Sequence, residues 1–225
     1  MSVKNKKIFV TGAGGKIGSK LVLALRKSGY DVLTLKRPGV DILEVAKYKK
    51  EMRSCDYVYH LVAYQNVLDK KEDEFYRVNV KGTQAIMRAL KGSRIKKFLY
   101  VSTVMVFDKN ETKNFYVTSK REALKLVKKS DLPWVVVYPS IVVDLKEKMV
   151  WWRRLLTGGV PGGLMSRLGD RERWIKFIWI DDLIEEMVDL VKNSRVGKEY
   201  ILEKEKVRAK DYMQLMRDRI RAIER

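Results

Sequence analysis

The sequence predicts an α/β fold built on a doubly wound parallel sheet, followed by a smaller C-terminal region. Short apolar runs alternate with amphipathic segments as far as Pro139, which is the rhythm of strands alternating with helices. The apolar runs are nearly continuous, as expected for strands that helices cover on both faces. A glycine-rich segment, 12–18, joins the first strand to the first helix. These three observations indicate an open sheet of parallel strands.

The expected strands are short runs rich in β-branched and aromatic residues, bounded by glycine, proline or polar residues. They span residues 8–11, 31–35, 40–42, 57–62, 97–102, 133–138, 177–180 and 199–202. Pro38 and Gly39 break the chain after the second strand, so the third is expected to be short.

The expected helices are amphipathic segments between these strands. They span residues 16–28, 43–53, 72–90, 114–129, 181–192 and 208–224. Gly29 ends the first of them, and 208–224 is a basic helix. After Pro139 the alternation stops, and residues 144–169 carry two tryptophans and a glycine-rich stretch. We therefore expect a sheet domain of residues 1–143 and 174–202, and a small cap with a terminal helix formed by 144–173 and 203–225.

The charge balance limits the class of partner. Lys and Arg number 48 against 28 Asp and Glu, so the formal net charge is +20. Such a charge favours anionic small molecules, nucleic acid or an acidic membrane face. The sequence has no recognisable nucleic-acid-binding motif, so a small, anionic molecule is the expected partner and nucleic acid is not.

Cysteine and histidine are nearly absent. Cys55 and His60 are the single residues of their types, which excludes an intrachain disulfide, a structural zinc site and a His-based catalytic triad. We expect no metal. The longest uncharged stretch, 132–143, contains two prolines and is too short for a membrane helix. No signal-peptide pattern follows the basic N-terminus, so we expect a soluble, cytoplasmic protein.

The glycine-rich segment Thr11–Gly18 reads T-G-A-G-G-K-I-G. Glycines after a strand permit a tight turn and let a pyrophosphate approach the free N–H groups of the following helix. The spacing is G-x-x-G-x-x-G and differs from the G-x-G-x-x-G of ordinary dehydrogenases. We interpret the segment as a dinucleotide-binding loop, and a glycine-rich turn without a ligand is the alternative.

The residues after the second strand bear on the choice of cofactor. An acid there would bond the ribose 2′-hydroxyl of NAD, whereas a cation accommodates the 2′-phosphate of NADP. Lys36 and Arg37 occupy this position, and Lys16 adds a cation from the glycine loop. NADP is therefore favoured over NAD. The alternative is that Lys36 and Arg37 are ordinary solvated side chains.

Two further segments carry polar groups suited to chemistry. Tyr116 and Lys120 are one turn apart on the expected helix 114–129 and share a face, although this spacing is common on Lys-rich helices. A nearby ammonium lowers the pKa of a phenol, so Tyr116 could act as an acid or base near neutral pH. Ser102 and Thr103 place hydroxyls at the carboxyl end of a strand, where they could also serve only as turn caps.

Taken in order, these motifs resemble the extended short-chain dehydrogenase/reductase family, the NAD(P)-dependent epimerases, dehydratases and reductases with a Rossmann-type sheet. Asp41-Ile42 stands where the family has its adenine-contacting Asp. His60–Ala63 is similar to the family's His-Leu-Ala-Ala strand end, and Asn79–Thr83 to its Asn-Val-x-Gly-Thr helix. Phe177–Leu183 resembles the late Phe-Ile-x-Val-Asp-Asp motif. The resemblance covers roughly residues 7–215.

The resemblance implies roles for individual residues. Tyr116 would be the catalytic acid/base, Lys120 its activator and a ribose contact, and Thr103 the hydroxyl that binds the substrate oxygen. With the loop and the cations above, the expected cofactor-binding residues are Gly12, Gly14, Gly15, Lys16, Ile17, Gly18, Lys36, Arg37, Asp41, Ile42, Leu61, Val62, Ala63, Asn79, Ser102, Lys120 and Pro139.

Departures from the family pattern narrow the reaction. Val104 and Met105 stand where dehydratases usually carry an Asp-Glu pair, so dehydration is disfavoured. The segments 132–140 and 197–202 are similar to the reductase branch that includes dihydroflavonol reductases and 3β-hydroxysteroid dehydrogenase-like proteins. We expect hydride transfer between nicotinamide and a carbonyl or secondary alcohol, with a nucleotide-sugar as one candidate substrate. A reductase and an epimerase would use the same residues. The alternative is a non-catalytic dinucleotide-binding or scaffold protein, which could associate with a membrane surface.

Assembly is also implied by the resemblance. Extended family members commonly dimerise through the helices that correspond to 72–90 and 114–129, so a homodimer is expected. We expect the aromatic-basic segment Trp151–Leu156 to pack within the cap. A substrate lid and a membrane-surface contact are less favoured alternatives for this segment.

Overall fold

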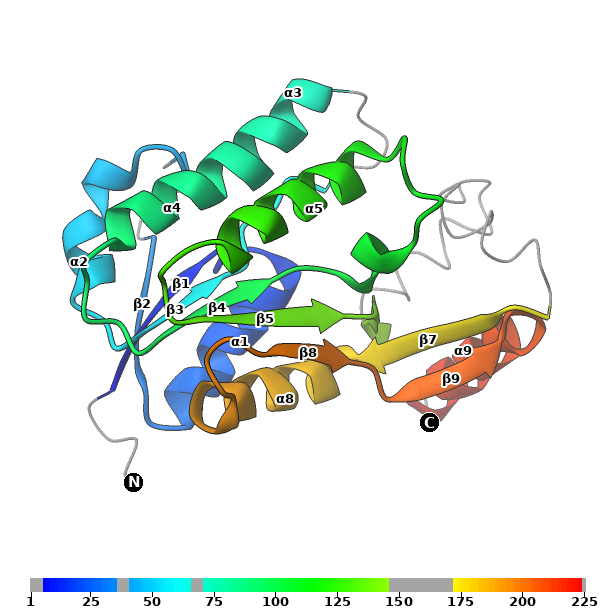
Figure 1. Cartoon of the computed structure of the whole chain (residues 1–225). Helices are drawn as coiled ribbons and strands as arrows, with labels where there is room; N and C mark the ends of the chain where they lie inside the picture. Colours follow the sequence, from blue (N-terminus) through cyan, green and yellow to red (C-terminus); the bar gives the residue numbers. More distant parts are fainter. Residues whose placement is uncertain (1–5, 36–40, 66–70, 146–171, 224–225) are drawn as a thin grey trace. The chain divides into compact units, whose positions relative to one another are not determined.

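The computed structural model describes residues 6–35, 41–65, 71–145 and 172–223 (Figure 1). The chain separates into two compact units. The first comprises Met1–Pro139 and Ile184–Leu202, and the second comprises Ser140–Leu183 and Glu203–Arg225.

The first unit is a parallel sheet of six strands in the order β2-β1-β3-β4-β5-β8. The strands are β1 (Lys7–Thr11), β2 (Asp31–Thr34), β3 (Tyr57–His60), β4 (Lys97–Val101), β5 (Trp134–Pro139) and β8 (Glu199–Leu202). The chain leaves β1 for β2 on one side and continues with β3 on the other. This reversal places the topological switch point at the carboxyl ends of β1 and β3, which is the usual ligand position in such sheets. The predicted fold class is confirmed.

Helices cover both faces of this sheet. α1 (Lys16–Lys27) and α8 (Ile180–Asn193) lie on one face in Figure 1, and α4 (Thr83–Leu90) and α5 (Phe115–Lys128) lie on the other. The core beneath α4 and α5 includes Phe9, Met52, Val58, Ile86, Phe98, Tyr100, Val127 and Val136. Because these strands are buried on both sides, their sequences are continuously apolar.

The predicted helix 72–90 is continuous but changes its winding. α3 (Glu72–Phe75) passes into a π-helical segment, η2 (Tyr76–Gly82), and then into α4. A π-helical turn widens the backbone and often occurs at functional positions. Apolar periodicity does not reveal such a change, so the sequence predicted the extent of this helix and missed its winding.

The predicted third strand at 40–42 is wrong in the part that the structure describes. Asp41 and Ile42 enter a turn in which the Asp41 carboxylate accepts the Leu43 N–H at 2.9 Å. The following segment forms a short 3-10 turn, η1 (Val45–Lys47), and α2 (Lys49–Arg53) in place of one helix from 43 to 53. An Asp side chain that bonds the backbone two residues later competes with strand pairing, which explains the turn.

The second unit has a three-stranded sheet in the order β6-β7-β9. β6 (Ile141–Val143) pairs parallel with β7 (Trp174–Trp179), and β9 (Glu205–Arg208) pairs antiparallel with β7. Helix α9 (Ala209–Ile223) contributes Tyr212 and Met216 to a small core with Phe177. Strands β6 and β9 were not predicted, because β6 has three residues and β9 reads Glu-Lys-Val-Arg, which has no apolar run.

Candidate functional site at the carboxyl edge of the parallel sheet

The glycine loop between β1 and α1 is held in very close contact with its surroundings. Gly12 has φ +72°, and a Cβ there would lie 2.9 Å from the Val62 nitrogen. A Cβ on Gly18 would lie 2.0 Å from the Gly12 oxygen. Gly15 precedes α1 without a side-chain cap, and the first turn of α1 has no acidic residue. The loop therefore presents helix N–H groups to an anion and leaves room only for glycine at two positions.

The end of β3 is fixed by a buried threonine–histidine pair. Thr11 Oγ1 lies 2.8 Å from His60 Nδ1 and accepts the N–H groups of Leu61 and Val62 at 3.2 and 3.4 Å. Burial lowers the pKa of His60 to about 3, and the nearby Lys120 charge adds to this effect. His60 is therefore neutral at physiological pH and serves as a hydrogen-bonding residue.

Asn79 fastens the segment that follows β3. Its Oδ1 accepts the Tyr64 N–H at 2.7 Å, and its Nδ2 donates to the Tyr64 carbonyl at 3.0 Å. Nδ2 also donates to Ser119 Oγ at 2.9 Å. Asn79 is 1% exposed. Asn79 therefore fixes the backbone of Tyr64 and links it to Ser119 on α5.

Tyr116 and Lys120 lie on the first two turns of α5, beside the end of β4. Asn114 caps the helix by accepting the Val117 N–H at 3.3 Å, which sets where α5 begins. Lys120 Nζ donates to the Val101 carbonyl at 2.7 Å and lies 4.4 Å from the centre of the Tyr100 ring. Two residues of the predicted set are thus brought to the same edge of the sheet as the glycine loop.

The pKa values at this pair correct the sequence prediction. Burial raises the pKa of Tyr116 to about 12, and burial lowers the pKa of Lys120 to about 7. The prediction that Lys120 lowers the pKa of Tyr116 is wrong, because the Lys120 ammonium is directed at the Val101 carbonyl. Tyr116 therefore carries its proton at neutral pH and is suited to donate it.

The end of β4 supplies two hydroxyls with different surroundings. Ser102 Oγ is buried and has no hydrogen-bond partner among the described residues. Thr103 Oγ1 accepts the Met105 N–H at 3.3 Å and so caps the 3-10 turn η3 (Val104–Phe107). The capping alternative for Thr103 is therefore observed, while its hydroxyl proton remains able to donate.

Arg121 holds the segment that follows η3, a contact that the sequence did not suggest. Its guanidinium donates to the carbonyls of Val106 at 2.9 Å and Glu111 at 3.1 Å, and also to the carbonyl of Asp108. Helix α5 therefore positions both the Tyr116–Lys120 pair and the segment beyond Thr103. The sequence does not reveal this role of Arg121, because a cation next to Lys120 looks like any other in a chain rich in Lys and Arg.

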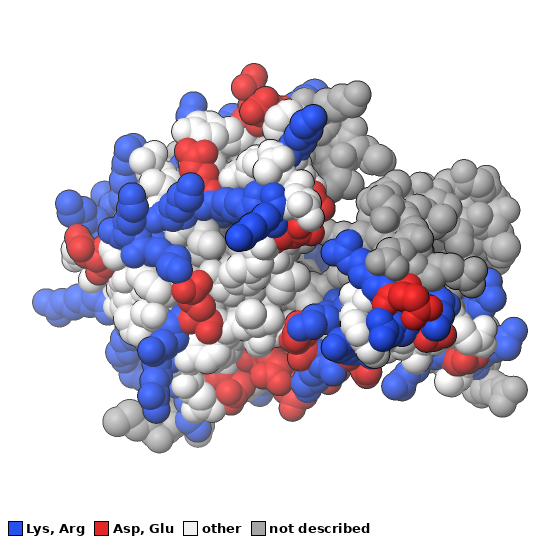
Figure 2. Space-filling model, turned by 45° about the vertical axis from the view of Figure 1, so that its right-hand side comes forward, with Lys and Arg blue, Asp and Glu red and all other residues white. Residues whose placement is uncertain are grey.

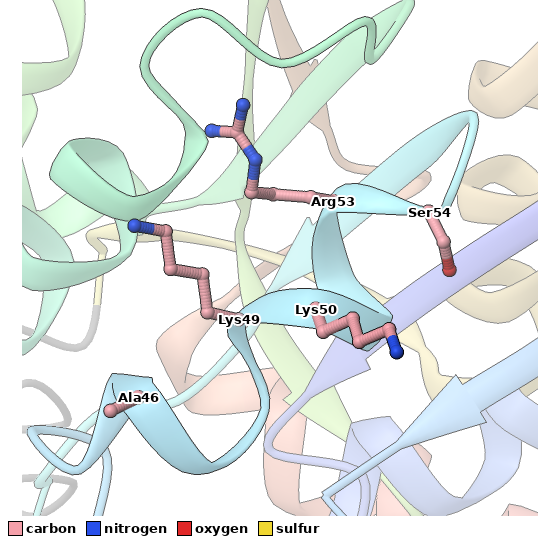
Figure 3. Close-up of a pocket in the computed structure, with 5 residues that line it drawn as sticks. All are labelled: Ala46, Lys49, Lys50, Arg53 and Ser54. Carbon is pink, nitrogen blue, oxygen red and sulfur yellow. The ribbon is translucent and has the colours of Figure 1, made fainter.

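A shallow hollow beside α2 is lined by Ala46, Lys49, Lys50, Arg53 and Ser54. In Figure 3, Lys49 and Arg53 extend to one side of the helix, and Lys50 and Ser54 to the other. Ser54 comes shortly before β3 begins at Tyr57, so the hollow lies toward the amino end of that strand. It is separate from the carboxyl edge that carries the glycine loop.

Comparison with known proteins identifies the family. A model of the NAD dependent epimerase/dehydratase family matches residues 8–130, which is more than half of the chain. The chain belongs to this family. The matched range includes the glycine loop, Asn79, Thr103, Tyr116 and Lys120. The resemblance to the extended short-chain dehydrogenases/reductases is thereby confirmed.

Two similar curated proteins are reductases by name. A dTDP-4-dehydrorhamnose reductase of Mycobacterium tuberculosis is 34% identical over 112 residues, which cover 48% of this chain and 36% of the relative. A 2-alkyl-3-oxoalkanoate reductase of Shewanella oneidensis is 26% identical over 218 residues, which cover 81% and 56%. The chain thus spans about half the length of these relatives or less.

A solved structure described as RMD from Pseudomonas aeruginosa complexed with NADPH shares the fold. The TM-score is 0.75 at 18% identity, and the match covers 96% of this chain and 84% of the other. This likeness concerns the fold alone.

The described residues fit the dinucleotide that the epimerase/dehydratase family name implies. Close backbone packing at Gly12 and Gly18 holds the loop 12–18 tightly against the start of α1, while a Cβ on Gly14 would meet only open space. This loop and the N-terminus of α1 are called the glycine cradle below. Ser102 adds a buried hydroxyl that has no hydrogen-bond partner among the described residues. Asp41 bonds Arg77, and Ile42 Cγ2 would lie 2.9 Å from a Cβ on Gly82, so both pack against the helix that carries Asn79. Lys36 and Arg37 lie outside the described residues.

The remaining predicted residues can also be located. Lys16 and Ile17 are the first two residues of α1. A Cβ on Gly14 would meet only open space. The segment directly after β3 contains Leu61, Val62 and Ala63. Pro139 is the last residue of β5. The structure adds Ser119, Tyr64 and Thr11 as residues that hydrogen-bond the members of this set. Ser119 directly precedes Lys120 in the sequence, but the sequence does not show that its hydroxyl has a partner, Asn79, on another helix.

Proposed function

We propose that the protein binds a nicotinamide dinucleotide at the carboxyl edge of the parallel sheet and catalyses hydride transfer. The hydride would pass between the nicotinamide and a carbonyl or secondary alcohol, as in a reductase or an epimerase. One observation carries this proposal. A glycine cradle at Gly12–Gly18 and the Tyr116–Lys120 pair lie at the same edge of one sheet.

In the reductive direction, Tyr116 donates a proton to the substrate oxygen as negative charge develops there. Its raised pKa keeps the O–H intact at neutral pH, so the donor form is the resting form. Thr103 donates a hydrogen bond to the same oxygen and orients it. A bound nicotinamide supplies or accepts the hydride. Lys120 is protonated in part near pH 7, and an adjacent anion or ribose hydroxyl would favour its charged form.

NADP is the proposed cofactor in preference to NAD. The support is Lys16, Lys36 and Arg37, together with the absence of an acid directly after the second strand. Cations at this position accommodate a 2′-phosphate.

The proposed substrate is a small, anionic molecule, with a nucleotide-sugar as one candidate. The net charge of +20 supports an anionic partner, and Figure 2 shows Lys and Arg side chains spread over much of the face it presents. The names of the two relatives, dTDP-4-dehydrorhamnose reductase and 2-alkyl-3-oxoalkanoate reductase, refer to a nucleotide-sugar and to an oxoalkanoate. Residues 144–173 and 203–225, which fall within the second unit, are proposed as the substrate cap.

A cytoplasmic homodimer is proposed as the working form. No helix in the described part of the chain is long and apolar enough to cross a membrane. The Trp151–Leu156 segment, where a lid or membrane contact was considered, lies outside the described residues. Nucleic acid is not a proposed partner.

Thermal stabilisation by NADPH and NADH tests the cofactor proposal, because a ligand that binds the folded state raises the melting temperature. A larger shift with NADPH is expected. Equal shifts, or a larger shift with NADH, would contradict the NADP preference. If neither NADPH nor NADH raised the melting temperature, dinucleotide binding would be contradicted.

Tyr116→Phe tests catalysis against the non-catalytic alternative. It should keep NADPH binding and lose turnover of any ketone or nucleotide-sugar that the wild type reduces. Full activity in Tyr116→Phe would show that the assignment is wrong.

A further inference from the structure

A chain of buried hydrogen bonds starts at the residue that precedes the glycine loop. Thr11 Oγ1 lies 2.8 Å from His60 Nδ1, and His60 Nε2 lies 3.0 Å from Thr83 Oγ1. Thr83 Oγ1 in turn donates to the Asn79 carbonyl at 2.6 Å. These four residues are all buried. The first half of this hydrogen-bond network therefore connects β1 and β3 to the π-helical segment η2.

The second half connects η2 to the helix that carries Tyr116. Asn79 Nδ2 donates to Ser119 Oγ at 2.9 Å, and Ser119 Oγ donates to the Tyr116 carbonyl at 2.9 Å. Ser119 is 5% exposed. Its hydroxyl is used once as acceptor and once as donor, so it has no proton left to offer a ligand.

The bonds run in one direction. The Thr83 hydroxyl gives its proton to Asn79, so it must accept from His60 Nε2–H. This fixes the neutral His60 tautomer with Nδ1 as the acceptor, and Thr11 then donates to it. Every donor from Thr11 to Ser119 therefore points toward Tyr116. A network in which every member is satisfied holds one arrangement rigidly.

The same hydrogen-bond network holds the loop after β3, Leu61–Tyr64, at both ends. Thr11 Oγ1 accepts the N–H groups of Leu61 and Val62, and Asn79 clamps the backbone of Tyr64. This loop forms one wall of the glycine cradle, since Val62 limits the space at Gly12.

An aromatic contact reinforces the connection. The Tyr64 ring packs edge-on against Phe75 at 4.9 Å between ring centres, and Phe75 lies 6.4 Å from Phe115. Phe115 is the residue before Tyr116. The Leu61–Tyr64 loop and the start of α5 are thus linked twice, by the hydrogen bonds through Asn79 and Ser119 and by the ring contacts through Phe75 and Phe115.

We propose that Asn79 and Ser119 are positioning residues that couple the Leu61–Tyr64 loop to the turn carrying Tyr116. Cofactor affinity then depends on the Asn79–Ser119 bond, which is buried away from the cradle. This inference rests on the proposed dinucleotide binding.

The test is a double-mutant cycle on NADPH affinity, measured by isothermal titration calorimetry with the full chain. Ser119→Ala should weaken NADPH binding about 5-fold, the effect of one buried hydrogen bond, and Ser119→Thr should restore it. In an Asn79→Asp background, where the donor to Ser119 is already lost, Ser119→Ala should cause no further loss.

The matched control is Thr118→Val. Thr118 Oγ1 donates to the Phe115 carbonyl at 3.2 Å, so it makes the same kind of bond to the residue three positions earlier. This variant should bind NADPH like the wild type. Melting temperatures of all variants report folding. If Asn79→Asp does not fold, the comparison of Ser119→Ala with Ser119→Thr and Thr118→Val still decides.

Wild-type affinity in Ser119→Ala, or equal losses in Ser119→Ala and Thr118→Val, would overturn the inference. So would the same loss from Ser119→Ala in both backgrounds. Each of these results would leave the proposed function intact, because the wild type would still bind NADPH. Failure of the wild type to bind either NADPH or NADH would overturn both proposals.

Discussion

Gly18 is the residue with the least room in the glycine loop, since a Cβ there would lie 2.0 Å from the Gly12 oxygen. The contact is with backbone, so a flexible side chain cannot yield. Gly18→Ala should displace α1 from the loop and lower the free energy of unfolding by about 1–3 kcal/mol. NADPH stabilisation should be lost as well. Urea unfolding with and without NADPH measures both effects.

Two glycines serve as controls for this prediction. Gly14 has open space and an ordinary φ, so Gly14→Ala should leave the free energy of unfolding unchanged. Gly92 has open space but φ +68°, so Gly92→Ala reports backbone strain alone, about 1 kcal/mol. Equal stability of Gly18→Ala and Gly14→Ala would contradict the close approach of α1.

His60 should make the protein sensitive to mild acid. Burial lowers its pKa to about 3 in the folded state, whereas the unfolded value is near 6.5. Between these values the unfolded chain binds the extra proton, so stability falls as the pH falls. The slope approaches about 1.4 kcal/mol per pH unit below pH 6.

His60→Gln should flatten that slope. It is the single histidine of the chain, and Lys120, with a pKa of about 7, is already largely protonated in this range, so His60 dominates the titration between pH 6.5 and 5. Urea unfolding of wild type and variant across this range provides the measurement. Parallel curves for the two proteins would refute the assignment. The variant's absolute stability does not enter the comparison.

At the scale of elements, the apolar strands β1, β3, β4 and β5 could be predicted because burial on both faces makes their sequences distinctive. β9 could not be predicted, since its alternating charges carry no such signal. The winding of η2 was missed because apolar periodicity does not distinguish a π-helical turn from an α-helix. The turn at Asp41 was missed because it depends on a single side-chain bond, from the Leu43 N–H to the Asp41 carboxylate.

The site shows the same division. The glycine loop and the Tyr116–Lys120 pair are local motifs and were found from spacing. Arg121 and Ser119 act on segments distant in the sequence, and a single sequence does not show which segments meet. The pKa order of Tyr116 and Lys120 was missed because burial outweighs the charge of a neighbour directed elsewhere.

Arg53 stabilises the C-terminal end of α4. It donates to the carbonyls of Ala89 and Lys91 at 2.8 Å and of Gly92 at 3.2 Å. A cation at a helix C-terminus also favours the helix dipole. Arg53→Met should lower the free energy of unfolding by about 1–2 kcal/mol.

Lys50→Met is the matched control for Arg53, because it removes an exposed cation from the same helix and the same hollow. It should change stability by less than about 0.5 kcal/mol. Chemical denaturation of both variants makes the comparison. Equal losses of stability in Arg53→Met and Lys50→Met would show that removal of any cation from α2 has this effect, and would contradict the capping role of Arg53.

At the scale of the whole molecule, the proposed homodimer would use the surface of η2, α4 and α5. Tyr76 is 41% exposed there, and Lys81 lies over its ring at 5.5 Å. Arg88 and Lys125 add positive charge, so assembly should strengthen as salt screens repulsion. Light scattering should give about twice 26.3 kDa at high salt. A mass near that of one chain at both low and high salt would contradict the dimer.

The order of strands in the large sheet has a consequence for synthesis of the chain. β8 pairs with β5, but the segment between them belongs largely to the second unit. The edge of β5 therefore stays open while roughly 60 residues are made, and Tyr138 meets Glu199 only after that interval. Because nascent domains fold as they emerge, this edge is the last part of the sheet to close. An unpaired strand edge is a site of aggregation, so conditions that slow synthesis of residues 140–198 should lower the yield of folded protein.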